Sequence, residues 1–139
     1  MATPWWRDHY AKLAADCAAL MLECPDEAGL HADVCRVAEA GEGVVKILLT
    51  RGVGERGYAL RPGRTATRIV LSAPLPAHAQ AAAPDGITAR WCALRLARQP
   101  RLAGIKHLNR LENVLARAEW DDPAIFEGLL CDDGGAVIG

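Results

Sequence analysis

The feature that most limits how this chain can fold is the stretch from Ala73 to Pro84, which holds three prolines and a run of alanines. It shows neither the period of a helix nor the alternation of a strand, and proline donates no backbone hydrogen bond. We therefore expect a linker over residues 74–85. Residues 1–73 would form one domain, of the α+β type, and residues 86–139 would belong to a second, α/β domain.

The first part predicts two helices and a pair of strands. From Pro4 to about Leu22, apolar residues recur at helical spacing. Pro25 ends this segment and opens a second helix, whose first turn is acidic and complements the helix dipole, and which Gly41 stops. Residues 44–50 and 65–72 have the composition of strands. We expect two helices packed on an antiparallel pair joined by a long loop.

The second part predicts a strand, a helix and a hairpin. Residues 87–94 alternate as a strand, and a basic loop follows them. Residues 125–131 and 136–138 have the composition of two short strands around a turn at residues 132–135. Between them, Glu119 to Asp122 place acids at the end of the predicted helix, which is unfavourable for the helix dipole. These acids therefore have another role or face water.

One lysine stands at the start of that predicted helix. Gly104 lets the chain turn, and apolar residues then follow at helical spacing: Leu108, Leu111, Val114, Leu115 and Ala118. Lys106 is thus expected at a junction between loop and helix. An amine held there can enter a cavity and form a Schiff base with a carbonyl, although a solvated surface lysine is the simpler interpretation.

Composition excludes several classes of function. The net charge of −1 and the few aromatic residues give no sign of nucleic-acid binding. The five cysteines form no CxxC pair and the four histidines show no metal spacing, so we expect free thiols and no metal site. The sequence shows no signal peptide and no membrane span, and we expect a cytoplasmic protein.

Two local patterns remain. Gly52, Gly54 and Gly57 match GxGxxG, but another strand rather than a helix follows, so we interpret them as loop formers and not as a dinucleotide site. Basic residues gather in two groups: Arg51, Arg56, Arg61, Arg64 and Arg68, and Arg90, Arg95, Arg98, Arg101, Lys106 and Arg110. If the groups converge they form a pocket for a small polyanion; otherwise they are solvated side chains.

Three stretches carry a resemblance to a known family: Leu102–Glu112 (LAGIKHLNRLE), Leu49–Tyr58 (LTRGVGERGY) and Glu127–Asp132 (EGLLCD). They resemble the aminodeoxychorismate lyases, which are fold-type IV pyridoxal-phosphate enzymes related to branched-chain and D-amino-acid aminotransferases. The similarity extends from about His9 to Val137. It implies a partial fold-type IV architecture, in which residues 86–139 begin the C-terminal domain that binds pyridoxal phosphate.

The resemblance also implies site residues. Lys106 would be the catalytic lysine that holds pyridoxal 5′-phosphate and transfers protons, and Lys12 would contact the cofactor phosphate. The family eliminates pyruvate from 4-amino-4-deoxychorismate to give 4-aminobenzoate in folate biosynthesis, and its members are homodimers. Arg51, Arg56 and Tyr58 would belong to the wall of the pocket, without assigned roles.

The chain departs from the family pattern at three places. Lys12 replaces a usual arginine and loses its bidentate fork, and Glu55 replaces a usual glycine. The family also continues beyond Gly139 with a glutamate for the pyridine nitrogen and with further phosphate ligands, and it begins earlier. We therefore expect a fragment truncated at both ends. A non-catalytic remnant and a related aminotransferase remain alternatives.

Overall fold

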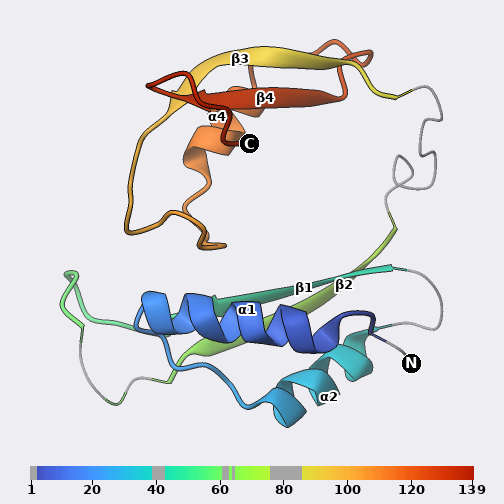
Figure 1. The fold of residues 1–139 in the computed structure, drawn as a ribbon. Coiled ribbons are helices and arrows are strands. Elements are labelled where there is room, and N and C mark those ends of the chain that lie inside the picture. The colour runs from blue at the N-terminus through green and yellow to red at the C-terminus, as the bar shows by residue number, and fades with distance from the viewer. Residues whose placement is uncertain (1–2, 39–42, 61–62, 64, 76–85) are drawn as a thin grey trace. The chain divides into compact units, whose positions relative to one another are not determined.

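The computed structural model describes residues 3–38, 43–60, 63, 65–75 and 86–139, and it shows the α+β architecture that the sequence predicts (Figure 1). The chain divides into two compact units, residues 1–80 and 81–139. Most of the expected linker lies outside the described residues. The elements are α1 (Trp6–Ala19), α2 (Glu27–Val37), β1 (Gly43–Thr50), β2 (Thr67–Pro74), β3 (Ala89–Leu96), α4 (Leu111–Arg117) and β4 (Glu127–Asp132).

The two helices of the first unit begin as expected, and α1 ends earlier than expected. Helix α1 ends at Ala19 because Met21 takes a left-handed conformation with φ of 54°, and the Leu22 N–H donates to the Cys17 carbonyl at 2.8 Å. The predicted end at about Leu22 was therefore too late. Helix α2 starts after Asp26, whose carboxylate accepts a hydrogen bond from the Gly29 N–H at 2.7 Å.

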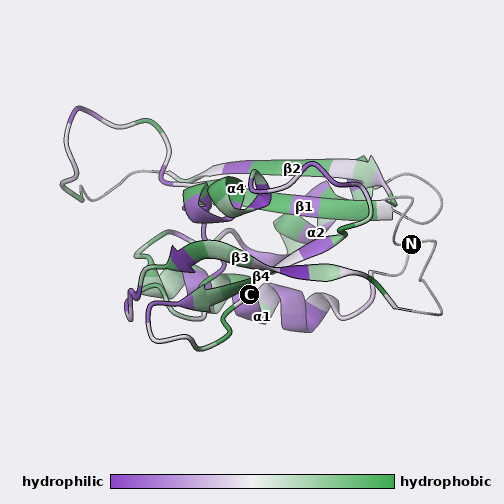
Figure 2. Ribbon diagram, turned by 90° about the horizontal axis from the view of Figure 1, so that it is seen from above, coloured by the Kyte–Doolittle hydropathy of each residue, from purple (hydrophilic) through white to green (hydrophobic). Residues whose placement is uncertain are grey.

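Strands β1 and β2 form the predicted antiparallel pair, in register from Gly43 opposite Pro74 to Thr50 opposite Thr67. Both strands consist mainly of hydrophobic residues (Figure 2). Helix α2 packs on β2, where Arg68 of the strand and Asp33 of the helix form an ion pair at 2.5 Å. The core of this unit consists of Cys17, Leu30 and Val34. This arrangement confirms the prediction of two helices and a strand pair.

In the second unit, β3 and β4 are parallel, and α4 connects them and packs against both (Figure 1). Its core contains Cys92, Ala116, Trp120 and Leu130. The strands approach Trp120 closely at Gly128, where an added Cβ would lie only 2.6 Å from the Cys92 sulfur. The prediction named both strands but not their parallel pairing, because pairing depends on residues far apart in the sequence.

Helix α4 corrects the prediction of a helix that starts near Lys106. It has seven residues and begins at Leu111, so Leu108 lies before it. The predicted inner face is largely exposed, since Leu111 is 65% and Val114 62% exposed, whereas Ala116 within the helix is buried with the following Trp120. The apolar spacing was read correctly, but packing against β3 and β4 selects a different face.

The C-terminal hairpin is present as a turn rather than as two full strands. The Asp132 carboxylate accepts hydrogen bonds from the Gly134 and Ala136 N–H groups, each at 2.9 Å. Beyond it, Val137 forms a single antiparallel bridge with Cys131, so the second predicted strand is wrong. Over the described ranges, no helix is long and apolar enough to span a membrane.

Candidate functional site

Lys106 lies in the loop of residues 97–110, which leads from β3 to α4, and its side chain is exposed. The loop contains two backbone turns. The Leu102 N–H donates to the Gln99 carbonyl at 2.9 Å, and the Ile105 N–H donates to the Leu102 carbonyl at 3.1 Å. Gly104 takes a φ of 75°, which favours glycine. The loop therefore has defined local structure immediately before the lysine.

The start of this loop is held by an arginine. Arg98 Nε lies 2.8 Å from Asp132 and 2.7 Å from Asp133, at the end of β4. Asp132 is only 6% exposed, and the Ala136 N–H and the Arg98 guanidinium lower the pKa of its carboxyl group. The lysine loop is thus attached to the neighbouring strand.

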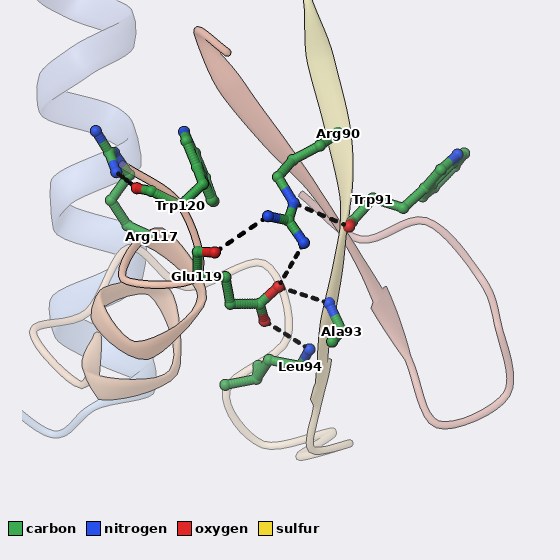
Figure 3. Close-up of polar contacts among 7 residues, drawn as sticks. All are labelled: Arg90, Trp91, Ala93, Leu94, Arg117, Glu119 and Trp120. Atoms are coloured by element: carbon green, nitrogen blue, oxygen red, sulfur yellow. Dashed lines mark hydrogen bonds and ion pairs between the residues drawn. The ribbon is translucent and has the colours of Figure 1, made fainter. Parts of the chain in front are cut away.

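Glu119, one of the acids that the sequence left without a role, binds the backbone of β3 (Figure 3). Its carboxylate accepts hydrogen bonds from the Ala93 and Leu94 N–H groups, both at 2.8 Å, and Arg90 Nη2 lies 3.5 Å away. The pairing with β4 shifts at this place, between Trp91 and Arg95. The two strand amides lower the pKa of Glu119. The carboxylate therefore replaces a partner strand at the bulge.

The residue next to Lys106 has an unsatisfied group. Among the described residues, His107 Nδ1 is a buried side-chain nitrogen without a hydrogen-bond partner. Buried polar atoms of this kind usually have a partner, so this nitrogen is an exception. Within the described ranges, no group of three His, Cys, Asp or Glu residues is placed so that it could hold a metal ion.

Lys12, the predicted phosphate contact, lies in the middle of α1. Its ammonium forms an ion pair with Asp16, four residues later on the same helix. Asp16 itself is 8% exposed. Lys12 and Lys106 belong to different compact units, and the role of Lys12 stays a prediction.

The glycine-rich segment after β1 is a loop, as expected. It surrounds a pocket of 240 Å³ lined by residues 51–59, which include Arg51, Arg56 and Tyr58. Gly52 has a φ of 76°, and no helix follows it. Arg51 donates to the Leu20 and Met21 carbonyls, at 2.6 and 2.8 Å, so its guanidinium caps the end of α1.

The arginines of the two basic groups serve partly to hold the fold. Arg68 pairs with Asp33, Arg90 with Glu119 and Arg98 with Asp132, while Arg61 and Arg64 lie outside the described residues. The two groups fall in separate units. Their convergence into one cationic pocket, which would bind an anion, therefore stays a prediction.

Over residues 2–138 the chain matches the model of the family described as amino-transferase class IV, and it belongs to that family. Enzymes of this family depend on pyridoxal phosphate.

Among individual proteins, the chain is similar to the 4-amino-4-deoxychorismate lyase of Pseudomonas aeruginosa. The crystal structure of that protein matches 94% of this chain with a TM-score of 0.84 and 43% identity.

The chain is also similar to two curated relatives, of which one is named as a lyase and the other as an aminotransferase. An aminodeoxychorismate lyase of Vibrio harveyi is 33% identical over 134 residues, which are 96% of this chain. A protein of Methanocaldococcus jannaschii, provisionally named as a branched-chain-amino-acid aminotransferase, is 26% identical over 95% of the chain. The chain spans 49% and 46% of these relatives, and 48% of the Pseudomonas structure.

The residues present fit pyridoxal phosphate at the lysine. An exposed primary amine suits an aldehyde, and the next residue, His107, has a buried Nδ1 without a hydrogen-bond partner. Glu119, Glu112 and the Arg98–Asp132 pair were not assigned from the sequence. Only the acids at the end of α4, unfavourable for the helix dipole, could have drawn attention to Glu119.

Proposed function

We propose that this chain carries the lysine-bearing part of an aminodeoxychorismate lyase, which eliminates pyruvate from 4-amino-4-deoxychorismate to give 4-aminobenzoate. The observation that carries the proposal is Lys106, an exposed lysine on a structured loop in a chain with 43% identity to a structurally characterised lyase.

In this proposal Lys106 has two roles. Its Nζ would hold pyridoxal phosphate, and the same amine would take the proton from C4 of the substrate ring. The cofactor, when bound, supplies an electron-withdrawing ring, and the aromaticity of the product favours the elimination. The protein then has to orient one amine and to position a small dianionic substrate.

The anionic groups require cationic partners. We propose Lys12 as a phosphate contact; since its ammonium pairs with Asp16, phosphate has to compete with that carboxylate. Arg56 and Tyr58, which line the pocket of residues 51–59, are candidates for contacts with substrate. Arg51 is a weaker candidate because its guanidinium already binds two helix carbonyls.

Two alternatives keep the same family. A branched-chain aminotransferase would use the same lysine, and the relative from Methanocaldococcus supports keeping this possibility in view. A non-catalytic remnant is the second alternative, and it predicts that the chain does not bind the cofactor. A homodimer and a cytoplasmic location stay predictions; the free cysteines among the described residues support the latter.

The experiment uses the fact that the chain has only three lysines, Lys12, Lys46 and Lys106. All three are exposed, so indiscriminate reaction with an aldehyde would label all of them. The purified chain is mixed with pyridoxal phosphate, reduced with borohydride and digested, and the modified peptides are quantified by mass spectrometry. We expect an absorption band near the visible edge and a label concentrated on Lys106.

The matched control is Lys46→Ala, which removes an exposed lysine of β1 and should leave the band unchanged. Lys106→Ala should abolish it. Equal labelling of the three lysines, or a band that survives Lys106→Ala, would refute cofactor binding and favour the remnant. If the band is present, pyruvate release from aminodeoxychorismate, compared with keto-acid formation from branched-chain amino acids, separates the lyase from the aminotransferase.

A further inference from the structure

The side chain of Glu112 closes the base of the loop that carries Lys106. Glu112, in the first turn of α4, reaches back across the loop, and its Oε1 accepts a hydrogen bond from the Ala97 N–H at 3.0 Å. Ala97 is the first residue after β3. The contact therefore joins the two ends of the segment 97–110.

The position of Glu112 gives this contact a favourable setting. An acidic side chain in the first turn of a helix is stabilised by the helix dipole, and the side chain of Arg110, at the N-terminus of α4, makes no capping hydrogen bond. The Ala97 N–H lies just beyond the last residue of β3. Glu112 thus supplies an acceptor to a backbone donor where the strand has ended.

The contact restrains the lysine through the chain. The loop start is also held by Arg98 on Asp132, and internal turns at Gln99 and Leu102 shorten the free segment before Lys106. Closing the base of a flexible loop removes part of its conformational entropy, and small displacements of a reacting group reduce its reactivity strongly. The Glu112 contact therefore adds a restraint at the base of the loop that carries Lys106.

We propose that Glu112 is a positioning residue for Lys106: it closes the base of the loop of residues 97–110 and thereby aims the lysine amine. What the lysine then does rests on the proposed function, whereas the restraint of the loop does not. Glu112 acts through the backbone of Ala97 and does not touch the reacting atoms.

The test compares Glu112→Ala with Glu112→Gln, because the amide oxygen of glutamine still accepts the hydrogen bond and alanine does not. The first readout is amide hydrogen exchange in the peptide of residues 97–106 of the full chain. We expect exchange about five-fold faster in Glu112→Ala, the factor for one hydrogen bond of ordinary strength. Glu112→Gln should stay close to the wild-type chain, and so should Asp121→Ala, which removes an exposed acid beyond the same helix.

The second readout is the distribution of the borohydride-trapped pyridoxal-phosphate label between Lys106 and Lys46. Glu112→Ala should lower the share on Lys106, and Glu112→Gln should restore it, whereas a merely stabilising role would shift the unfolding midpoint without changing this share. Equal exchange in the wild-type chain and Glu112→Ala, or equal label shares in the two glutamate variants, would overturn the proposal. If the wild-type chain shows no preference for Lys106, the proposed function fails, and hydrogen exchange alone decides whether Glu112 restrains the loop.

Discussion

Replacing Gly128 with alanine should destabilise the second unit, because the added methyl group meets two core side chains. A Cβ at this position would lie 2.6 Å from Cys92 Sγ and 2.7 Å from Trp120 Cη2. Cys92 is 3% and Trp120 6% exposed, so neither can turn out into solvent without leaving the core. Overpacking of this kind costs about 1–3 kcal/mol.

The structure places the expected value in the upper part of that range, at about 2 kcal/mol or more. The Cys92 sulfur is one bond from the Cβ of a strand residue and has little room to move. The Trp120 ring is fixed because its Nε1 donates to the Ile125 carbonyl at 3.1 Å, and the Arg117 guanidinium lies 4.6 Å from the ring centroid. Relief therefore requires movement of the β4 backbone.

The assay is urea unfolding of the whole chain, followed by circular dichroism, with the midpoint compared at an unchanged slope. Gly139→Ala is the matched control, because nothing lies within 4 Å of its added Cβ. In a Cys92→Ala background, Gly128→Ala should be less destabilising, since one of the two close contacts is gone. A wild-type midpoint for Gly128→Ala, or an equal effect in both backgrounds, would refute the reasoning.

Three further predictions concern other contacts. Hydrogen bonds from two strand amides lower the pKa of Glu119, so its contribution to stability is present above its ordinary pKa of 4.5 and is lost as the pH falls through the lowered value. On acid titration, Glu119→Gln should therefore lose less stability than the wild-type chain. Parallel titration curves for the two proteins would contradict this. Burial raises the pKa of the Cys17 thiol to about 11, whereas Cys35 is exposed. Iodoacetamide at pH 8 should therefore modify Cys35 first, which peptide mass spectrometry can measure. Early modification of Cys17 in the folded chain would contradict its burial. Arg51→Ala should lower the free energy of unfolding by about 0.5–1 kcal/mol because the end of α1 loses a cation. Arg56→Ala is the control. Equal unfolding midpoints for the two variants would show that Arg51 does not stabilise the end of α1.

The elements of this fold could be predicted from the sequence where the signal is local. The start of α2 follows from the cap at Asp26, and the strands β1, β2 and β3 follow from their composition. The exposed position of Lys106 next to a turn at Gly104 also follows from its neighbours. These features depend on residues a few positions apart, which periodicity and turn chemistry describe well.

The features that could not be predicted depend on distant contacts. Helix α4 begins at Leu111 rather than near Lys106, and it buries Ala116 instead of the leucine stripe, because β3 and β4 select the packed face. The carboxylate of Glu119 reaches a strand more than twenty residues earlier in the chain, at Leu94. No pattern within a short window contains such a pairing.

The bulge in β3 also determines which changes of chain length this unit can accept. Glu119 binds the N–H groups of Ala93 and Leu94 at the place where the pairing of β3 with β4 shifts. Inserting or deleting one residue in β3 before Ala93 would turn Cys92 away from the core. It would also place the N–H groups of two other residues opposite the Glu119 carboxylate. Residues 97–110 lie outside this constraint, and their length is limited instead by the contact between Glu112 and Ala97 and by the position of Lys106.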